Sequence, residues 1–249
     1  MDFLGLMRVK NEEEFIEEVL ESQWFCEKIL ILNNYSVDRT KEICQSFKNV
    51  TVIDAADVPF PDIYDEGKDQ EYLCERAREY NPKWICRMQG DEVLERDTYE
   101  KLMPYIDDPN ARCIEVHSLN YWNDNQTIRV DGCVGQGFRQ SFWRFPDEKL
   151  TYDFMHCSLP RQLQSVPMMR IGLSLWHYGF MSPARRRKTA TLFKSVDKNK
   201  LSKYDWPLQG DSGGPSRQEN LTGEPFRLQP VNEFLIGKPY SRRAREYYV

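Results

Sequence analysis

The chain has 249 residues, of which 40% are hydrophobic and 29% are charged, and its net charge is −5. This composition is that of a globular domain and excludes a collagen-like, coiled-coil or wholly disordered chain. The apolar runs are too short to span a membrane, the first residues do not resemble a secretory signal, and the seven cysteines contain no CxxC pair. We therefore expect a cytoplasmic protein without structural zinc, and the acidic balance argues against stable nucleic-acid binding.

The first hundred residues alternate between strand and helix patterns. The predicted strands are residues 3–9, 28–32, 49–54 and 84–88, and the predicted helices are residues 12–22, 39–47 and 69–80. Short apolar strands that alternate with amphipathic helices indicate right-handed crossovers and a parallel sheet covered on both faces. The fold class is therefore α/β.

The pattern changes in the second half of the chain. A helix is predicted at residues 98–106, strands at 113–119, 138–145 and 173–178, and a basic helix at 183–196. Residues from about 207 to 225 are rich in Gly, Ser and Pro, which is typical of a loop. We expect residues 181–249 to form a helical and irregular C-terminal extension.

Polar residues follow each of the first four predicted strands. Because the carboxyl ends of parallel strands meet at one edge of a sheet, ligands bind there. The residues concerned are Arg8, Lys10, Asn11, Asn33, Asn34, Ser36, Asp38, Asp54, Asp57, Gln89, Asp91 and Glu92. The alternative interpretation is that these are ordinary loop residues, with Ser36 or Asp38 capping the next helix. No glycine-rich phosphate loop follows the first or second strand, which argues against a dinucleotide dehydrogenase or a P-loop enzyme.

Three segments, in this order, resemble the N-terminal half of a family 2 glycosyltransferase with the GT-A fold. They are RVKNEEEFIEEVLES, ILILNNYSVDRTKEIC and WICRMQGDEVL, which are similar to the family patterns (P/R)xxNEE, DxxSxDxT and W(I/V)xxxDxDE. A fourth segment, LWHYGFMSPARRRK, is similar to the histidine-containing strand and basic helix of one soluble branch of that family. The resemblance implies a GT-A domain in residues 1–180, with a nucleotide-binding half at 1–95 and an acceptor half at 96–180.

The activity that the resemblance implies is that of a hexosyltransferase-like enzyme. It would move a sugar from a nucleotide-diphosphate donor to a hydroxyl group of a glycan or other acceptor, with inversion and with Mn²⁺ or Mg²⁺. The residues that would contact the nucleotide sugar are Arg8, Lys10, Asn11, Asn33, Asn34, Ser36, Asp38, Gln89 and Arg185. The alternative is a non-catalytic homologue that binds a sugar nucleotide or a glycan.

The leaving diphosphate gains negative charge, which a divalent cation or basic side chains must stabilise. The resemblance makes Asp91 the second Asp of the DxD motif and a metal ligand. It makes His177 a metal or diphosphate contact, with an ordinary buried histidine as an equal alternative. Gln89 and Asn33 stand where the motifs have their first Asp. Three interpretations remain: a metal held by one carboxylate and the diphosphate, which we favour, a metal-independent site that uses residues 185–188, and an inactive homologue.

An inverting transferase also needs a carboxylate base that takes the proton of the acceptor hydroxyl. The usual ED-type sequence has no clean copy here, and Asp131 and Asp153 are equal candidates, with a surface-loop role as the alternative for either. The basic run at 185–188 is expected first on a solvated helix face, because consecutive residues of a helix cannot all face one way. Its alternatives are neutralisation of the diphosphate, or docking of an anionic acceptor, a membrane surface or nucleic acid.

Overall fold

The computed structural model describes residues 1–60, 65–124, 126–130, 137–154, 159–196 and 228–230. The described residues form two compact units. The first unit holds those within 1–116 and 139–173, and the second holds those within 117–138 and 174–230. The predicted boundary near residue 180 and the predicted halves of the domain stay predictions.

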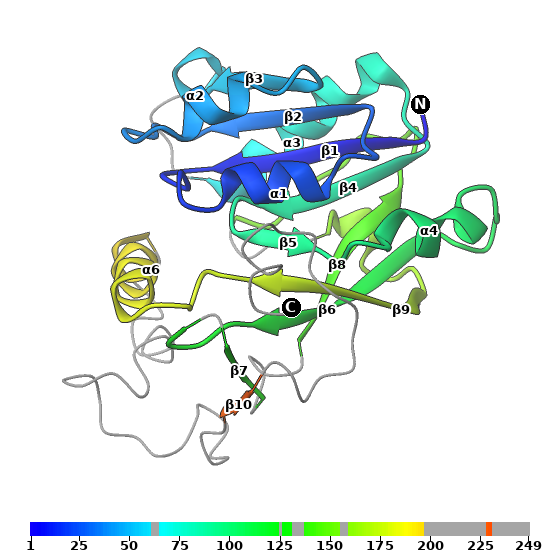
Figure 1. Ribbon diagram of the computed structural model, residues 1–249. Coiled ribbons are helices and arrows are strands. Elements are labelled where there is room, and N and C mark those ends of the chain that lie inside the picture. The colour runs from blue at the N-terminus through cyan, green and yellow to red at the C-terminus, as the bar shows by residue number, and fades with distance from the viewer. Residues whose placement is uncertain (61–64, 125, 131–136, 155–158, 197–227, 231–249) are drawn as a thin grey trace. The chain divides into compact units, whose positions relative to one another are not determined.

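Among the described residues, eight strands form one sheet in the order β3, β2, β1, β4, β8, β6, β9, β5 (Figure 1). Their bounds are β1 Phe3–Val9, β2 Lys28–Asn33, β3 Val50–Asp54, β4 Trp84–Gln89, β5 Glu92–Leu94, β6 Cys113–Asn120, β8 Gly137–Arg144 and β9 Met168–His177. Strand β1 pairs in parallel with β2 and β4, and β2 pairs in parallel with β3, whereas β8 is antiparallel to β4. Strands β7 (Thr127–Arg129) and β10 (Leu228–Pro230) form a separate antiparallel pair. The predicted α/β class is confirmed.

The helices follow the predicted order. Their bounds are α1 Ile16–Ser22, α2 Thr40–Gln45, α3 Glu66–Ala77, α4 Thr98–Leu102 and α6 Pro183–Val196, with short 3-10 turns η1 Ala55–Asp57, η2 Arg78–Tyr80, η3 Met103–Tyr105 and η4 Arg161–Leu163. Strands β5, β7 and β10 were not predicted, because three residues are too few to show a hydrophobic period. In the described part of the chain, no helix is long and apolar enough to cross a membrane.

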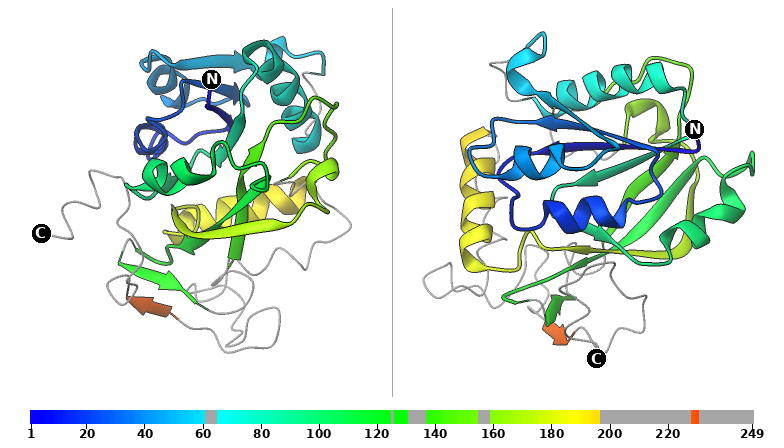
Figure 2. Two further views of the ribbon diagram at one scale, coloured as in Figure 1. Left: turned by 90° about the vertical axis from the view of Figure 1, so that its right-hand side faces the viewer. Right: turned by 45° about the horizontal axis from the view of Figure 1, so that its top comes forward.

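Alternation along the parallel strands divides the core between two faces of the sheet. Leu4 and Leu6 of β1 belong to the apolar cluster that also contains Leu73 of α3. On the other face, Gly5 leaves room for the side chains of Ile29 and Gln23, and Gln23 directly follows α1. Helices α1 and α2 therefore cover one face of these strands and α3 covers the other (Figure 2). Because side chains alternate, the polar residues that end each strand also divide between the two faces.

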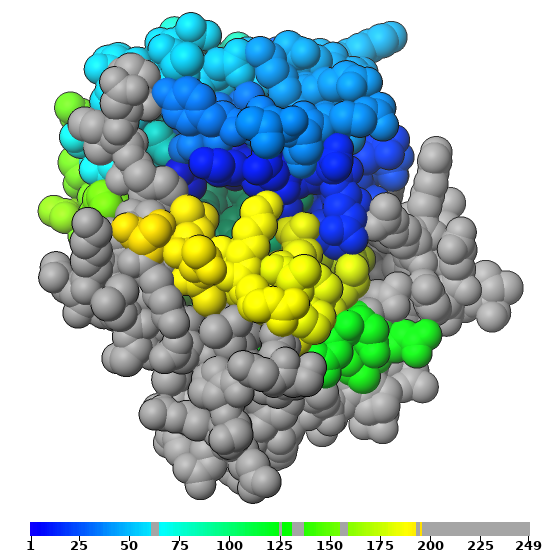
Figure 3. Space-filling model, turned by 90° about the vertical axis from the view of Figure 1, so that its left-hand side faces the viewer, coloured from blue at the N-terminus to red at the C-terminus, as the bar shows by residue number. Residues whose placement is uncertain are grey.

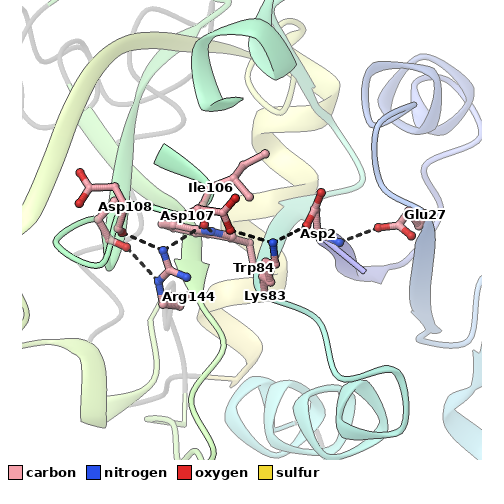
Figure 4. A network of polar contacts seen from close by, with 9 residues as sticks. Asp2, Glu27, Lys83, Trp84, Ile106, Asp107, Asp108 and Arg144 are labelled. Carbon is pink, nitrogen blue, oxygen red and sulfur yellow. Dashed lines mark hydrogen bonds and ion pairs between the residues drawn. The ribbon is translucent and has the colours of Figure 1, made fainter. Parts of the chain in front are cut away.

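The amino ends of the parallel strands are closed by ion pairs and a stacked arginine (Figure 4). Lys83 Nζ lies 2.8 Å from Asp107 Oδ1. The guanidinium of Arg144 lies 4.9 Å from the ring centre of Trp84 and donates to the backbone carbonyl oxygen of Asp108 at 2.8 Å. These contacts join the amino ends of β1 and β4 to the segment that precedes β6 and to the end of β8.

Candidate functional site

The loops that follow β1 and β2 are joined by reciprocal hydrogen bonds. The backbone N–H of Asn11 donates to Ser36 Oγ at 3.0 Å, and Asn11 Oδ1 accepts from the backbone N–H of Val37 at 2.8 Å. Asn11 has a left-handed backbone with φ of 56°, which asparagine tolerates better than most residues. Figure 3 looks onto this carboxyl edge, where the two loops, in blue, lie side by side. These two hydrogen bonds therefore fix the loops after β1 and β2 relative to each other.

Asp38 caps the start of α2. Its Oδ1 accepts from the backbone N–H of Thr40 at 3.0 Å and from the Thr40 hydroxyl at 2.5 Å, and its Oδ2 accepts from the N–H of Glu13 at 3.2 Å. Partial burial raises the pKa of Asp38, but these hydrogen bonds outweigh it and set the pKa below the ordinary 3.8. The capping role that the sequence offered as an alternative is therefore present, while contact of Asp38 with a nucleoside stays a prediction.

Asn33 lies opposite Asp54 in the parallel pairing of β2 and β3. Its Nδ2 donates to Asp54 Oδ1 at 2.9 Å, and Lys41 Nζ of α2 lies 2.5 Å from Asp54 Oδ2. The bonds from Lys41 and from Asn33 lower the pKa of Asp54. An amide donor at residue 33 suits this partner, whereas the Asp of the family pattern would place a second carboxylate against Asp54. The departure from the pattern at Asn33 therefore has a local physical reason.

A second polar cluster lies on the α3 face of the same edge. Arg8 follows Leu6 on this face, and its Nε forms an ion pair with Asp69 in the first turn of α3. Asn34 lies beside this ion pair, and with its amide oxygen turned toward Arg8 it would accept from Arg8 Nη2 at 2.6 Å. Burial raises the pKa of Asp69, and the neighbouring Arg8 offsets only part of that rise. The cluster joins the ends of β1 and β2 to the start of α3.

The turn between β4 and β5 is held by a buried carboxylate. Glu92 Oε2 accepts from the backbone N–H of Gln89 at 2.9 Å, and Glu92 Oε1 lies 2.5 Å from Arg139 Nη1 of β8. The Glu92 side chain is 1% exposed and that of Arg139 is 26% exposed. Because Arg139 neutralises the carboxylate, Glu92 can be buried beside the motif without an unpaired charge.

Asp91 lies within this turn. A Cβ at Gly90 would come within 2.8 Å of Glu12 Cγ, so the turn packs closely against the loop after β1. Asp91 is buried, at 9% exposure. The structure therefore places Gln89 and Asp91 at the same edge as the β1 and β2 loops, where the sequence predicted them.

Asp153, one of the two candidate bases, lies beside the start of α3. A Cβ at Gly67 would overlap the backbone carbonyl oxygen of Asp153, and Gly67 is two residues before Asp69. The Asp153 side chain is 53% exposed, and its Oδ1 lies 2.7 Å from Arg161 Nη2. Asp153 is thus at the carboxyl edge, and its role as a base stays a prediction. Asp131, the other candidate, lies outside the described residues.

His177 belongs to the second unit, where it is buried. Its Nδ1 lies 2.6 Å from Asn120 Oδ1, and its ring meets Phe180 edge-on with centroids 4.8 Å apart. Asn120 was not identified from the sequence, because it lies 57 residues away from its partner. This hydrogen bond fixes the orientation of the imidazole ring. The role of His177 toward a metal or a diphosphate stays a prediction.

The four basic residues of α6 are not all exposed to solvent, as they would be on a solvated helix face. Arg187 and Lys188 are exposed and Arg185 is partly buried, but Arg186 is fully buried. The guanidinium of Arg186 donates to the backbone oxygen of Phe180 at 2.8 Å and lies 4.7 Å from the ring centre of Trp122. This carbonyl and the aromatic face offset the cost of burying the cation.

No protein-family model and no curated protein matches the sequence. Solved structures do match the fold. The chain is similar to residues 1–349 of S. aureus TarS in complex with UDP-GlcNAc, with a TM-score of 0.50 and 11% identity, over 84% of this chain and 70% of that chain. The chain has a GT-A-like fold. It also matches Mycobacterium tuberculosis glucosyl-3-phosphoglycerate synthase in complex with Mn²⁺, UDP-glucose and phosphoglyceric acid, with a TM-score of 0.36 and 15% identity, over 48% of this chain and 44% of that chain.

The metal-binding capacity of this GT-A-like domain can be judged from its donor atoms. Within the described ranges, no three His, Cys, Asp or Glu side chains form a group that could hold a metal ion. Mg²⁺ and Mn²⁺ prefer oxygen ligands, and Mg²⁺ is often bound by one or two carboxylates together with substrate phosphates. The Asp91 carboxylate and the Gln89 amide oxygen are donors of this kind at the turn after β4. Asp91 and Gln89 could therefore supply two oxygen ligands to a cation whose other ligands come from a bound diphosphate.

Two residues at the carboxyl edge, Asp69 and Arg139, were not predicted from the sequence. Asp69 lies at the start of a predicted helix, and its partner Arg8 is 61 residues away. Arg139 follows residues 131–136, which the structure does not describe, and it pairs with Glu92 across the sheet. An acidic residue in the first turn of a helix that follows a strand is a weak signal for Asp69. No local signal in the sequence identifies Arg139.

Proposed function

We propose that the protein is a glycosyltransferase that moves a sugar from a nucleotide-diphosphate donor to an acceptor hydroxyl. The proposal depends on one observation, the convergence of the loops after β1, β2 and β4 on a single polar edge. The motif resemblance of these loops supports it, as does the similarity of the fold to a protein crystallised with UDP-GlcNAc. We further propose that the enzyme is of the family 2, hexosyltransferase-like kind.

The donor would lie along this edge. The nucleoside would contact the loops of β1 and β2, which carry Asn11, Asn33 and Asn34, and the diphosphate would lie toward Gln89 and Asp91. The remaining contacts that we propose for the nucleotide sugar are Arg8, Lys10, Ser36, Asp38 and Arg185. The described amides, carboxylates and guanidinium of the first unit are fixed by neighbours before any ligand binds, which reduces the entropy cost of binding.

The reaction that we propose is an inverting displacement. The acceptor oxygen forms a bond to the anomeric carbon as the bond from that carbon to the diphosphate oxygen breaks, and a carboxylate takes the proton of the acceptor. Asp153 and Asp131 are the candidates for this base. When Mg²⁺ or Mn²⁺ is bound, it supplies positive charge to the leaving diphosphate, and Asp91 and His177 are its proposed ligands. Asp91 would orient the diphosphate end of the donor.

A second candidate function is binding of a nucleotide sugar or a glycan without catalysis. The observation that favours it is Gln89, which replaces a carboxylate of the metal motif with a neutral amide. A weaker metal site would lower the rate of transfer more than it lowers the affinity for the nucleoside.

Incubation of the full chain with UDP-, GDP- and dTDP-sugars and Mn²⁺ tests the proposal. Release of the nucleoside diphosphate is expected from at least one donor, and calorimetry measures binding of the same donors. Turnover supports the transferase. Tight binding without turnover supports the binding protein instead. If the chain shows no binding and no turnover, both candidate functions are contradicted.

A further inference from the structure

Tyr35, in the loop after β2, has a left-handed backbone with φ of 53°. The left-handed region is unfavourable for a bulky side chain, because Cβ comes close to the following carbonyl oxygen. The other described residues besides glycine with positive φ are Asn11, Asn81 and Asn123. Asparagine is the residue that tolerates this conformation, so the backbone alone does not explain an aromatic residue at position 35.

The conformation of Tyr35 is fixed by hydrogen bonds on both sides. The backbone N–H of Asn34 donates to the carbonyl of Val9 at 2.8 Å, and the N–H of Tyr35 donates to the carbonyl of Asn33 at 3.1 Å. The N–H of Ser36 donates to Asn33 Oδ1 at 3.3 Å. The backbone is therefore held by its neighbours, which is the situation in which strain persists at functional sites.

Burial of the ring does not account for the aromatic residue either. Tyr35 is 46% exposed, and Val37 in the same loop is 90% exposed. The loop therefore presents apolar surface at the edge where Asn33 contacts Asp54 and Asn34 contacts Arg8. A planar ring beside several hydrogen-bonding groups is what a nucleobase requires, because the base stacks through its face and is read through its edge.

We propose that Tyr35 stacks on the base of the nucleotide donor and contributes to selection of the nucleotide. This inference rests on the proposed function and adds a residue whose role is specificity. In this arrangement the Tyr35 ring covers one face of the base. The diphosphate does not contact Tyr35.

Calorimetry of UDP, GDP, CDP and dTDP with the full chain tests this role. The variant Tyr35→Asn removes the ring but keeps a residue suited to positive φ, and Tyr35→Phe keeps the ring. We expect Tyr35→Asn to bind the preferred nucleotide about ten-fold or more weakly, and Tyr35→Phe to bind it within about two-fold of the wild type. Inorganic pyrophosphate should bind both variants as it binds the wild type, because it has no base.

Asn81→Gly is the matched control, since Asn81 also has positive φ but precedes β4 at the amino edge of the sheet. It should leave nucleotide affinity unchanged, and the Tm of Tyr35→Asn should be no lower than that of the wild type. Unchanged affinity of Tyr35→Asn for a nucleotide that the wild type binds overturns the inference alone. A lower Tm of Tyr35→Asn would assign the ring a structural role and would also overturn the inference. If the wild type binds no nucleoside diphosphate, the proposed function fails, and the inference fails with it.

Discussion

Asn33 and Asp54 lie opposite one another at the carboxyl ends of two parallel strands, joined by a 2.9 Å hydrogen bond from amide to carboxylate. Lys41 holds the other carboxylate oxygen at 2.5 Å. The pair shows why an amide at residue 33 is compatible with this edge. It also predicts the effect of restoring the acid of the family pattern.

Asn33→Asp should destabilise the protein by about 1–2 kcal/mol at pH 7, because two carboxylates would then share one site. Repulsion raises the pKa of one of them in the folded state, so the loss should shrink as the pH falls toward 4. Urea unfolding at both pH values measures this difference. Asn110→Asp is the control, because Asn110 Nδ2 also donates to a carboxylate, that of Asp108 at 3.1 Å, but is exposed. An equal loss in both variants would contradict the explanation.

Asp38→Ala should cost about 1 kcal/mol of folding free energy at pH 7, because it removes the cap of α2. The pKa of Asp38 is lower in the folded state than its ordinary 3.8. Its stabilisation is therefore complete well above pH 3.8 and is lost as the pH falls through the folded pKa. Urea unfolding at pH 7 and pH 3 should show a difference between variant and wild type that narrows at pH 3. The exposed Asp57→Ala should show no such change.

Arg139→Met should destabilise the protein by about 2 kcal/mol, because it leaves the buried Glu92 carboxylate without its cation. The double variant with Glu92→Gln should recover most of this loss, since a neutral amide needs no cation and its oxygen still accepts from Gln89. Arg161→Met, which breaks an exposed pair with Asp153, should cost almost nothing. Chemical denaturation measures all four proteins. A double variant as unstable as Arg139→Met would show that charge burial is not the cause.

Gly67→Ala should displace the segment around Asp153, because the added Cβ would overlap a backbone oxygen rather than a flexible side chain. We expect a loss of about 2 kcal/mol or more. Hydrogen exchange of the Tyr152 amide, which donates to Glu71 Oε1 at 2.9 Å, should become faster. Lys68→Ala, at the exposed neighbouring position, is the control. If the Tyr152 amide of Gly67→Ala exchanged as slowly as in the wild type, the close approach of Gly67 to the Asp153 carbonyl would be excluded.

Asp91→Asn should lower turnover about 100-fold with the best donor, because it removes the carboxylate nearest to the proposed diphosphate position. Asp97→Asn, a neutralisation of an exposed residue beyond β5, should leave turnover unchanged. Steady-state release of the nucleoside diphosphate measures both. Unchanged turnover of Asp91→Asn would show that the metal assignment is wrong.

Part of the candidate site could be predicted from the sequence because it depends on local patterns. The positions of Asn11, Asn33 and Asp91 follow from strand ends, and a strand end is marked by a change from apolar to polar residues. The ion pairs of the site could not be predicted in the same way. Asp69 and Glu92 are neutralised by arginines that lie far away in the chain, and only the packing of α3 and β8 against the strands brings them together.

The sequence alone was enough to predict the alternation of strands and helices, the parallel arrangement of β1 to β4 and the loops that meet at the carboxyl edge. These features follow from hydrophobic period and from the handedness of crossovers, which are local properties. Three features are visible only in the folded chain: Arg186 is buried, Asp38 caps α2 and Tyr35 has a left-handed backbone. Each of these depends on contacts or backbone geometry that hydrophobic patterning does not specify.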